Sequence, residues 1–177
     1  MARFCGGGRL CSSMKQGAPE SREATPALAK AISTHKFVAG MKPEHLKKLV
    51  EAAMFKQFER DELVFREGDP ANRFYLISRG KIALESRRND ESAPLVEFLG
   101  PGNVLGWSWL FPPYYWHYDA RAVEPTSAIF FYGTRLREQC EHDPEFGYDL
   151  MKRVAAVAIK RLQSARAELL KLQEKVG

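Results

Sequence analysis

The sequence lacks the features of a membrane protein, a disulfide-stabilised protein or a metalloprotein. No run of apolar residues approaches the roughly 18 that are needed to cross a bilayer. The 177 residues include three cysteines, which form neither a Cys-x-x-Cys pair nor a disulfide framework: Cys5, Cys11 and Cys140. No cluster of cysteine and histidine has metal-ligand spacing, because the four histidines are scattered: His35, His45, His117 and His142. We therefore expect a cytoplasmic protein with no membrane segment and no metal.

The motifs of the common enzyme classes are also missing. The sequence contains no nucleophile–base motif and no phosphate-binding P-loop. The Gly-x-Gly at 100–102 is not a dinucleotide fingerprint, because it contains Pro101 and no helix is expected directly after it. A metal enzyme of the cupin type would need several histidines on its strands, and the strand-rich region offers only His117. We expect a non-enzymatic protein with no cofactor.

The length suits one domain with a substantial core, plus a tail or an accessory helix. Much of the net charge of +5 lies near the start, because residues 1–35 hold five basic and two acidic residues. Residues 1–26 contain Gly-Gly-Gly, Ser-Ser and scattered prolines, which favours disorder, whereas 27–35 has the pattern of a short helix. We assign residues 1–30 to a disordered, solvated N-terminal tail and residues 31–142 to the folded domain.

The middle of the chain has the pattern of a β-protein. A helix is predicted from Pro43, with apolar residues at helical spacing. After it come short runs rich in aromatic and β-branched residues, separated by turn signals such as Gly-Asp-Pro and Gly-Pro-Gly. This pattern predicts an antiparallel sandwich or barrel. The runs are Met54–Phe58, Glu62–Arg66, Arg73–Ser78, Lys81–Ser86, Leu95–Leu99 and Ala128–Tyr132.

The last segment, residues 143–177, predicts one long helix. Asp143 is a suitable N-cap and Pro144 suits the first helical position. A second apolar row on a neighbouring face suits packing on the strands: Leu150, Val154 and Val157. Apolar residues at alternating spacings of four and three form a heptad seam, which we interpret as the interface of a homodimer. The seam consists of Met151, Ala155, Ala158, Leu162, Ala165, Leu169 and Leu172.

The segment from Trp107 to Tyr118 is the most unusual part of the sequence. Seven of its twelve residues are aromatic and it holds all three tryptophans of the chain. Glycines at 100, 102 and 106 indicate tight turns just before it. Aromatic side chains at this density indicate either a corner of the core or a ligand pocket.

Two motifs in this order resemble the family of cyclic-nucleotide-binding domains. Residues 65–81 resemble its first signature, in which a turn at Gly68, a strand through Tyr75-Leu76-Ile77 and a turn at Gly80 follow one another. Residues 99–106 resemble the stretch that leads into its phosphate-binding cassette. The resemblance implies a mainly β fold with flanking helices, namely a double-stranded β-helix, or jelly-roll-like β-roll, followed by a long C-terminal helix. It also implies a regulatory domain that responds to a small molecule.

The sequence departs from the family at the residues that hold the nucleotide. The family's cassette opens Gly-Glu-Leu, where the glutamate binds the ribose, and an arginine about ten residues later binds the cyclic phosphate. Here Gly106 is followed by Trp107, and the arginine position falls on Trp116 or His117. Arg121 is the nearest guanidinium, but strand alternation turns it to the opposite face from Trp116. We therefore expect no tight binding of cAMP or cGMP.

Three interpretations of the aromatic segment remain open at this point. The aromatics fill the nucleotide site as core, or they line a pocket rebuilt for another ligand, or a cyclic nucleotide still binds through backbone N–H groups with His117 or Arg121 on its phosphate. The candidate ligand-binding residues at the cassette position are Gly106, Trp107, Ser108, Trp109, Leu110, Trp116, His117, Tyr118 and Arg121.

Two functions follow from the resemblance. The first is a stand-alone sensor or regulatory domain whose effector is altered or absent and whose protein partner is unknown. The second is a regulator responsive to cAMP or cGMP, related to catabolite-activator transcription factors. We expect no direct DNA binding, because the sequence given ends at Gly177 without a helix-turn-helix domain, and the basic residues of the last helix are spaced like a solvated face.

Overall fold

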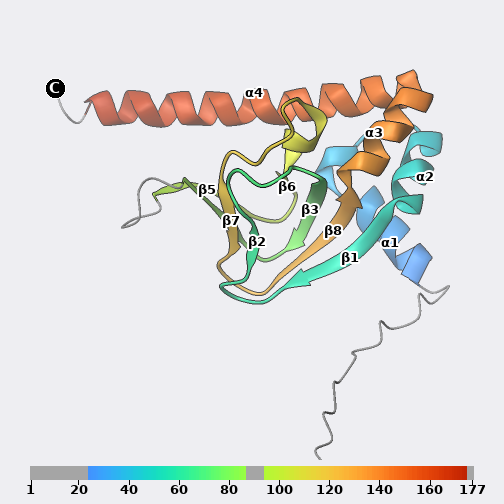
Figure 1. Ribbon diagram of the computed structural model, residues 1–177, viewed down its shortest axis with the longest axis horizontal. Helices are drawn as coiled ribbons and strands as arrows, with labels where there is room; N and C mark the ends of the chain where they lie inside the picture. Colours follow the sequence, from blue (N-terminus) through green and yellow to red (C-terminus); the bar gives the residue numbers. More distant parts are fainter. Residues whose placement is uncertain (1–23, 87–93, 175–177) are drawn as a thin grey trace, which may run out of the picture.

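The computed structural model describes residues 24–86 and 94–174 and consists of a β-roll with helices along one side (Figure 1). Two four-stranded antiparallel sheets form the roll, in the orders β1-β8-β3-β6 and β2-β7-β4-β5. The strands are β1 (Ala53–Phe58), β2 (Leu63–Phe65), β3 (Arg73–Arg79), β4 (Ile82–Glu85), β5 (Leu95–Leu99), β6 (Val104–Leu105), β7 (Asp119–Ala122) and β8 (Thr126–Tyr132). The expected mainly β fold, a β-roll followed by a long helix, is confirmed.

Both faces of the central strand β3 are buried, which explains why its sequence is almost uninterruptedly apolar. Phe74 and Leu76 face the helices, while Tyr75 and Ile77 face the interior between the two sheets. All four side chains are at most 1% exposed. Because successive side chains on a strand point to opposite faces, β3 contributes to two separate hydrophobic clusters. One cluster fills the roll, and the other joins the roll to its helices.

Helices cover the outer face of the β1-β8-β3-β6 sheet. They are α1 (Ala24–Ser33), α2 (Pro43–Glu51), α3 (Gly133–His142) and α4 (Pro144–Glu174), with the short 3₁₀ helices η1 (Lys36–Val38) and η2 (Trp107–Leu110). The prediction of a helix from Pro43 is confirmed by α2. The helix α3 was not predicted, because a single residue on it, Leu136, is both apolar and fully buried. A helix held by one large apolar side chain leaves little periodicity in the sequence.

The strand predictions were right for the apolar runs and missed two elements near the aromatic segment. The predicted runs correspond to β1, β2, β3, β4, β5 and β8. Strand β6 has only two residues, and β7 has the sequence Asp-Ala-Arg-Ala, which lacks the β-branched and aromatic residues typical of strands. Both strands are fixed by pairing with neighbours, β6 with β3 and β7 with β2 and β4.

The folded part begins earlier than the sequence suggested. Helix α1 begins at Ala24, three residues before the short helix predicted at 27–35, and its residues 24–30 belong to the folded part rather than to the expected tail. The reason is tertiary packing: Leu28 and Ile32 are buried in the cluster between sheet and helices. The rest of the expected tail, residues 1–23, lies outside the described residues.

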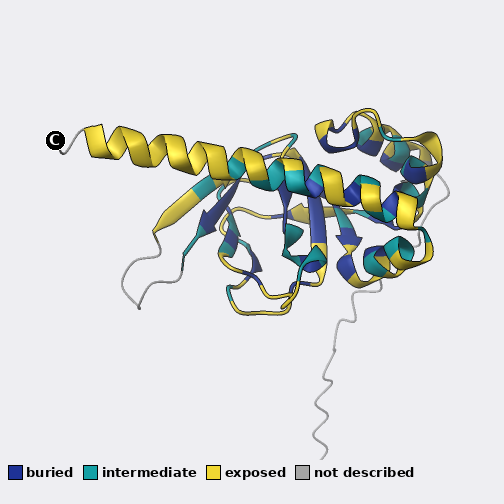
Figure 2. Cartoon of the chain, turned by 90° about the horizontal axis from the view of Figure 1, so that it is seen from above, coloured by how far each residue is buried: buried dark blue, intermediate teal, exposed yellow. Residues whose placement is uncertain are grey.

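Helix α4 starts as predicted and then extends past the roll. The Oδ1 atom of Asp143 accepts hydrogen bonds from the backbone N–H groups of Glu145 and Phe146, each at 3.1 Å. Leu150 and Val154 are fully buried, which confirms that the second apolar row packs on the domain. Beyond Arg161, every described residue of α4 is exposed, and this half of the helix projects from the body of the protein (Figure 2).

Candidate functional site

The first family-like motif lies beside the aromatic segment and fixes its course. The turn after Phe65 runs beside residues 114–116, and the two stretches are joined by three backbone hydrogen bonds. Gly68 N donates to Trp116 O at 2.9 Å, Trp116 N donates to Asp69 O at 3.0 Å, and Ala71 N donates to Tyr114 O at 2.6 Å. This pairing holds the segment beside the connection between β2 and β3.

The three tryptophans lie in three different environments. Trp109 is fully buried among the helices and the outer face of the sheet, with its ring centroid 5.9 Å from that of Phe74. Trp116 lies inside the roll, where its ring stacks on Phe65 at a centroid distance of 4.0 Å and an angle of 13°. Trp107 is half-buried and lines a cavity. The aromatic segment is thus partly core and partly pocket wall.

Gly106 is required where the segment leaves β6. Its φ of 84° lies in the left-handed region, which side chains other than glycine rarely adopt. A Cβ atom at this position would lie 2.9 Å from Cη2 of Trp116 and 3.0 Å from the backbone oxygen of Arg73. Gly106 therefore allows the turn and the close approach of Trp116 at the same time.

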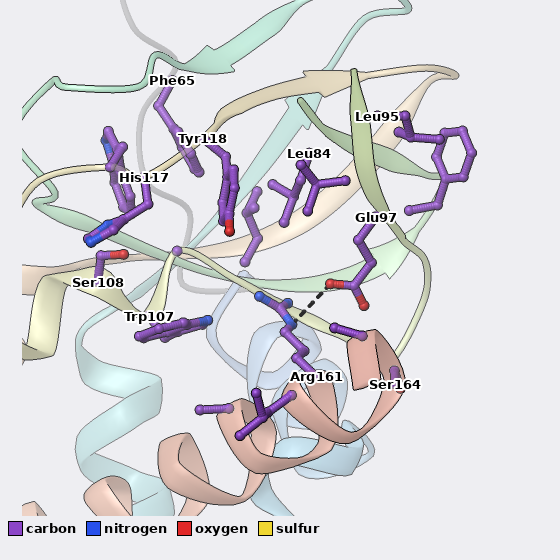
Figure 3. Close-up of a pocket in the computed structure, with 18 of the residues that line it drawn as sticks. Phe65, Leu84, Leu95, Glu97, Trp107, Ser108, His117, Tyr118, Arg161 and Ser164 are labelled. Atoms are coloured by element: carbon purple, nitrogen blue, oxygen red, sulfur yellow. Dashed lines mark ion pairs between the residues drawn. The ribbon is translucent and has the colours of Figure 1, made fainter. Parts of the chain in front are cut away.

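A cavity of about 780 Å³ lies between the roll and α4 (Figure 3). Pockets for small ligands are commonly of 300–1,000 Å³, so this volume is of the right size. Its walls are mostly apolar and come from β2, β4, β5, β6, the aromatic segment and α4. The apolar lining includes Phe65, Leu84, Leu105, Trp107, Trp116 and Leu162.

One ion pair spans the cavity from helix to sheet. The Nε atom of Arg161 on α4 lies 3.5 Å from Oε2 of Glu97 on β5 (Figure 3). The Nη2 atom of Arg161 donates a hydrogen bond to the backbone oxygen of Val104 at 2.6 Å. Burial lowers the pKa of Arg161 from its usual value, and the carboxylate of Glu97 opposes that shift. The guanidinium is thus a largely desolvated cation.

Most of the predicted cassette residues line this cavity. Six of the nine do so: Gly106, Trp107, Ser108, Trp116, His117 and Tyr118. Trp109 and Leu110 do not, because they pack toward the helices instead.

Arg121 points away from the cavity, as predicted, although the strand that carries it begins only at Asp119. Its Nε atom lies 3.4 Å from Oε2 of Glu85, and its Nη1 atom donates to Asp61 O at 3.1 Å. His117 is exposed, and its Nδ1 atom lies 3.0 Å from the backbone oxygen of Tyr115. No arginine of the described cassette therefore reaches the cavity.

The residues of the predicted heptad seam lie in two different environments. Ala158, Leu162 and Ala165 line the cavity, although they were predicted as dimer contacts. Farther along, Leu169 and Leu172 are 61% and 60% exposed and do not line the cavity. The helix therefore serves as one wall of the cavity before it presents an uncovered apolar row.

Sequence reasoning missed Arg161 and Glu97, and a signal for Arg161 was present. Leu150, Val154 and Val157 pack on the domain, and the next residue on that helical face is Arg161. The basic residues of α4 were interpreted as a solvated face, which is wrong for this one. Glu97 had no comparable signal, because its role depends on which edge of the sheet meets α4.

Two general properties bear on the kind of site. Among residues 24–86 and 94–174, no group of three or more His, Cys, Asp or Glu side chains is placed to hold a metal ion. In the same ranges, no helix combines the length and hydropathy of a membrane span.

Comparisons with known proteins agree with the fold. Over 131 residues, the chain is 28% identical to a CRP-like cAMP-activated global transcriptional regulator of Mycobacterium tuberculosis; the match covers 74% of this chain and 58% of the relative. The chain thus spans little more than half the length of that relative. Over 100 residues, it is 29% identical to a potassium channel protein of Rhodopseudomonas palustris, of which 23% is covered.

Solved structures give the same result. A protein of Geobacter metallireducens, provisionally classed as a cyclic nucleotide-binding protein, superposes with a TM-score of 0.69 at 29% identity, covering 76% of this chain and 97% of that one. The catabolite activator protein of Thermus thermophilus superposes with a TM-score of 0.62 at 22% identity, covering 78% of this chain and 63% of that one. The family described as "Cyclic nucleotide-binding domain" matches residues 55–143, half of the chain. The chain belongs to the cyclic nucleotide-binding domain family and is related to the CRP-like regulators.

Proposed function

We propose that this domain is a non-enzymatic sensor whose cavity binds a small effector without the contacts that usually hold a cyclic nucleotide. The observation that carries the proposal is the position of Trp116, one of the two residues aligned with the family's phosphate-binding arginine. Its ring is 4% exposed and stacks on Phe65 inside the roll. Trp107, aligned with the ribose-binding glutamate, offers the cavity a mostly apolar ring in place of a carboxylate.

The energetic cost of these replacements is large. Removing one partner of a desolvated, hydrogen-bonded charge pair typically costs about 2–5 kcal/mol, or roughly thirty- to several-thousand-fold in affinity. His117, the other residue aligned with that arginine, is exposed at the cavity edge. Micromolar binding of a cyclic nucleotide by the usual contacts would fall toward millimolar.

Helix α4 is the element suited to report an effector, because it forms a wall of the cavity and then leaves the roll. We propose that its exposed apolar row pairs with that of a second copy of the chain. An effector that shifts the cavity wall would then change the relative orientation of the two copies.

Titration calorimetry of the purified protein with cAMP and with cGMP tests this function. We expect dissociation constants near millimolar or no measurable heat, with the cAMP-activated mycobacterial relative as the positive control. A dissociation constant of a few micromolar for either nucleotide would contradict the proposal and favour a cyclic-nucleotide-responsive regulator. Native mass spectrometry of the same preparation should detect any small molecule that copurifies.

A further inference from the structure

The cavity contains one permanently charged cation, and it comes from the helix rather than from the cassette. Among the described residues that line the cavity, Arg161 is the only arginine or lysine. Its side chain is 19% exposed, and Figure 3 shows its guanidinium extending into the cavity between Trp107 and Glu97. An anion entering the cavity would therefore meet its strongest attraction on the α4 side.

The guanidinium keeps donors that the protein does not use. A guanidinium carries five N–H groups in a planar fork that matches a carboxylate. In the described structure, one hydrogen bond leaves it, from Nη2 to Val104 O at 2.6 Å. Its contact with Glu97 is an ion pair at 3.5 Å, which is at the outer limit of a hydrogen bond.

Glu97 is placed to be replaced by a ligand. Its side chain is 37% exposed, on β5, the edge strand of its sheet. Rotation of the partly exposed Glu97 carboxylate into water costs little free energy. The buried guanidinium of Arg161, in contrast, is stable only beside a negative charge. Exchange of Glu97 for a ligand carboxylate leaves the charge around the guanidinium unchanged.

The remaining lining limits the charge and the body of the ligand. The cavity is lined by two carboxylates, Glu97 and Glu168, and one guanidinium, so a group with more than one negative charge would be repelled. The other walls are largely aromatic and aliphatic. An aromatic or aliphatic body would gain the free energy of leaving water on these walls.

We propose that the cavity binds a monocarboxylic acid with an apolar body, whose carboxylate takes the place of Glu97 on Arg161. This proposal rests on the function proposed above and names the chemical class of its effector. The ligand carboxylate accepts hydrogen bonds from the N–H groups of Arg161, and the apolar body of the ligand lies against Trp107, Leu84 and Leu162. Arg161 is also the last residue of α4 that is not exposed, so the exchange occurs where the helix leaves the roll.

Calorimetry with matched acids and amides tests the ligand class. The probes are decanoate with decanamide, and phenylbutyrate with phenylbutyramide, each pair differing in charge but hardly in shape. We expect each acid to bind at least about tenfold more tightly than its amide, since hydrogen bonds to a charged group contribute about 1.5–3 kcal/mol. Binding of acid and amide with equal affinity would overturn the carboxylate proposal and leave the cavity as a ligand site.

Three variants connect the preference to the named residues. Arg161→Gln should abolish the difference between acid and amide. Glu97→Gln should strengthen acid binding severalfold without changing amide binding, because the competing carboxylate is removed; this holds even if Arg161→Gln does not fold. Arg166→Gln, on the exposed part of the same helix, should leave all affinities unchanged.

The remaining outcomes separate the two proposals. If Arg161→Gln folds and keeps the acid preference, or if Glu97→Gln weakens acid binding, the assignment of the carboxylate to Arg161 is wrong. If neither acids nor amides bind, the carboxylate proposal is overturned, and the absence of any copurifying molecule would then count against the sensor function too. If cAMP binds at micromolar concentration while the acids do not, both proposals are wrong.

Discussion

Trp116 and Trp107 show how one residue type takes different roles within a single segment. Trp116 stacks on Phe65 inside the roll, whereas Trp107 meets Phe111 edge-on at a centroid distance of 6.1 Å and lines the cavity. The sequence could predict that the segment was important but not how its rings divide between core and cavity. That division depends on which side chains from distant strands meet each ring.

Replacing each tryptophan by alanine should separate these roles. We expect Trp116→Ala to lower the free energy of unfolding by about 3–5 kcal/mol, because it leaves a hole in a packed interior. Trp107→Ala should cost less, about 1–2 kcal/mol, since its ring is only partly buried. Urea denaturation followed by circular dichroism measures both. Equal losses for the two variants would show that Trp107 is also a core residue.

At the scale of elements, the contact between α2 and α4 depends on a buried polar cluster. His45 Nδ1 lies 3.2 Å from Asp149 Oδ2, and Arg153 Nε donates to Asp149 Oδ1 at 2.9 Å. Arg153 Nη1 also donates to the backbone oxygens of Phe37 and Ala39, at 2.8 and 2.9 Å. The cluster therefore joins α4 to both α2 and η1. Asp149 and Arg153 are four positions apart on α4, but nothing in the sequence indicated the pairings between elements, which join residues more than a hundred positions apart.

The cluster predicts how stability depends on pH. Burial by itself raises the pKa of Asp149, but hydrogen bonds from His45 and Arg153 outweigh it and hold that pKa below its usual value. A carboxyl whose pKa is lower in the folded state stabilises the fold above its unfolded pKa of about 3.9. That contribution disappears as the pH falls through the folded value.

The wild type should accordingly lose stability more steeply than Asp149→Asn as the pH is lowered from about 5 to about 2. The urea midpoint of each protein across this range measures the effect. The matched control is Asp61→Asn. Asp61 is exposed, and its carboxylate lies 3.9 Å from Arg60 Nε, so this variant should follow the wild type. Parallel curves for the wild type and Asp149→Asn would contradict the assigned role of this carboxylate.

On the scale of the whole molecule, the outer half of α4 has no partner in the described structure. Leu169 and Leu172 are 61% and 60% exposed on the part of the helix that projects beyond the roll (Figure 1). An isolated helix of this length is marginal in water, and its stability ordinarily comes from packing an apolar face. A second copy of the chain would supply that packing through the heptad seam.

Light scattering at tens of micromolar tests this pairing. The chain has a mass of 20.1 kDa, so we expect about twice that value for the wild type. Leu169→Glu with Leu172→Glu should give the monomer, because charges on the seam would repel across the interface. Gln163→Glu with Gln173→Glu adds the same charge to exposed positions off the seam and should remain dimeric. A wild type of about 20 kDa would exclude the dimer.

The sequence by itself determined the features that depend on neighbours along the chain. Short aromatic and β-branched runs between turn signals indicated most of the roll, alternation along the chain indicated the direction of Arg121, and Asp143-Pro144 indicated the start of α4. Only the tertiary structure decided the rest. It divided the three tryptophans between core and cavity, and it brought Arg161 beside Glu97 across sixty-four positions. The physical reason is that burial and ion pairing depend on which distant surfaces meet, whereas periodicity records only which face of each element is apolar.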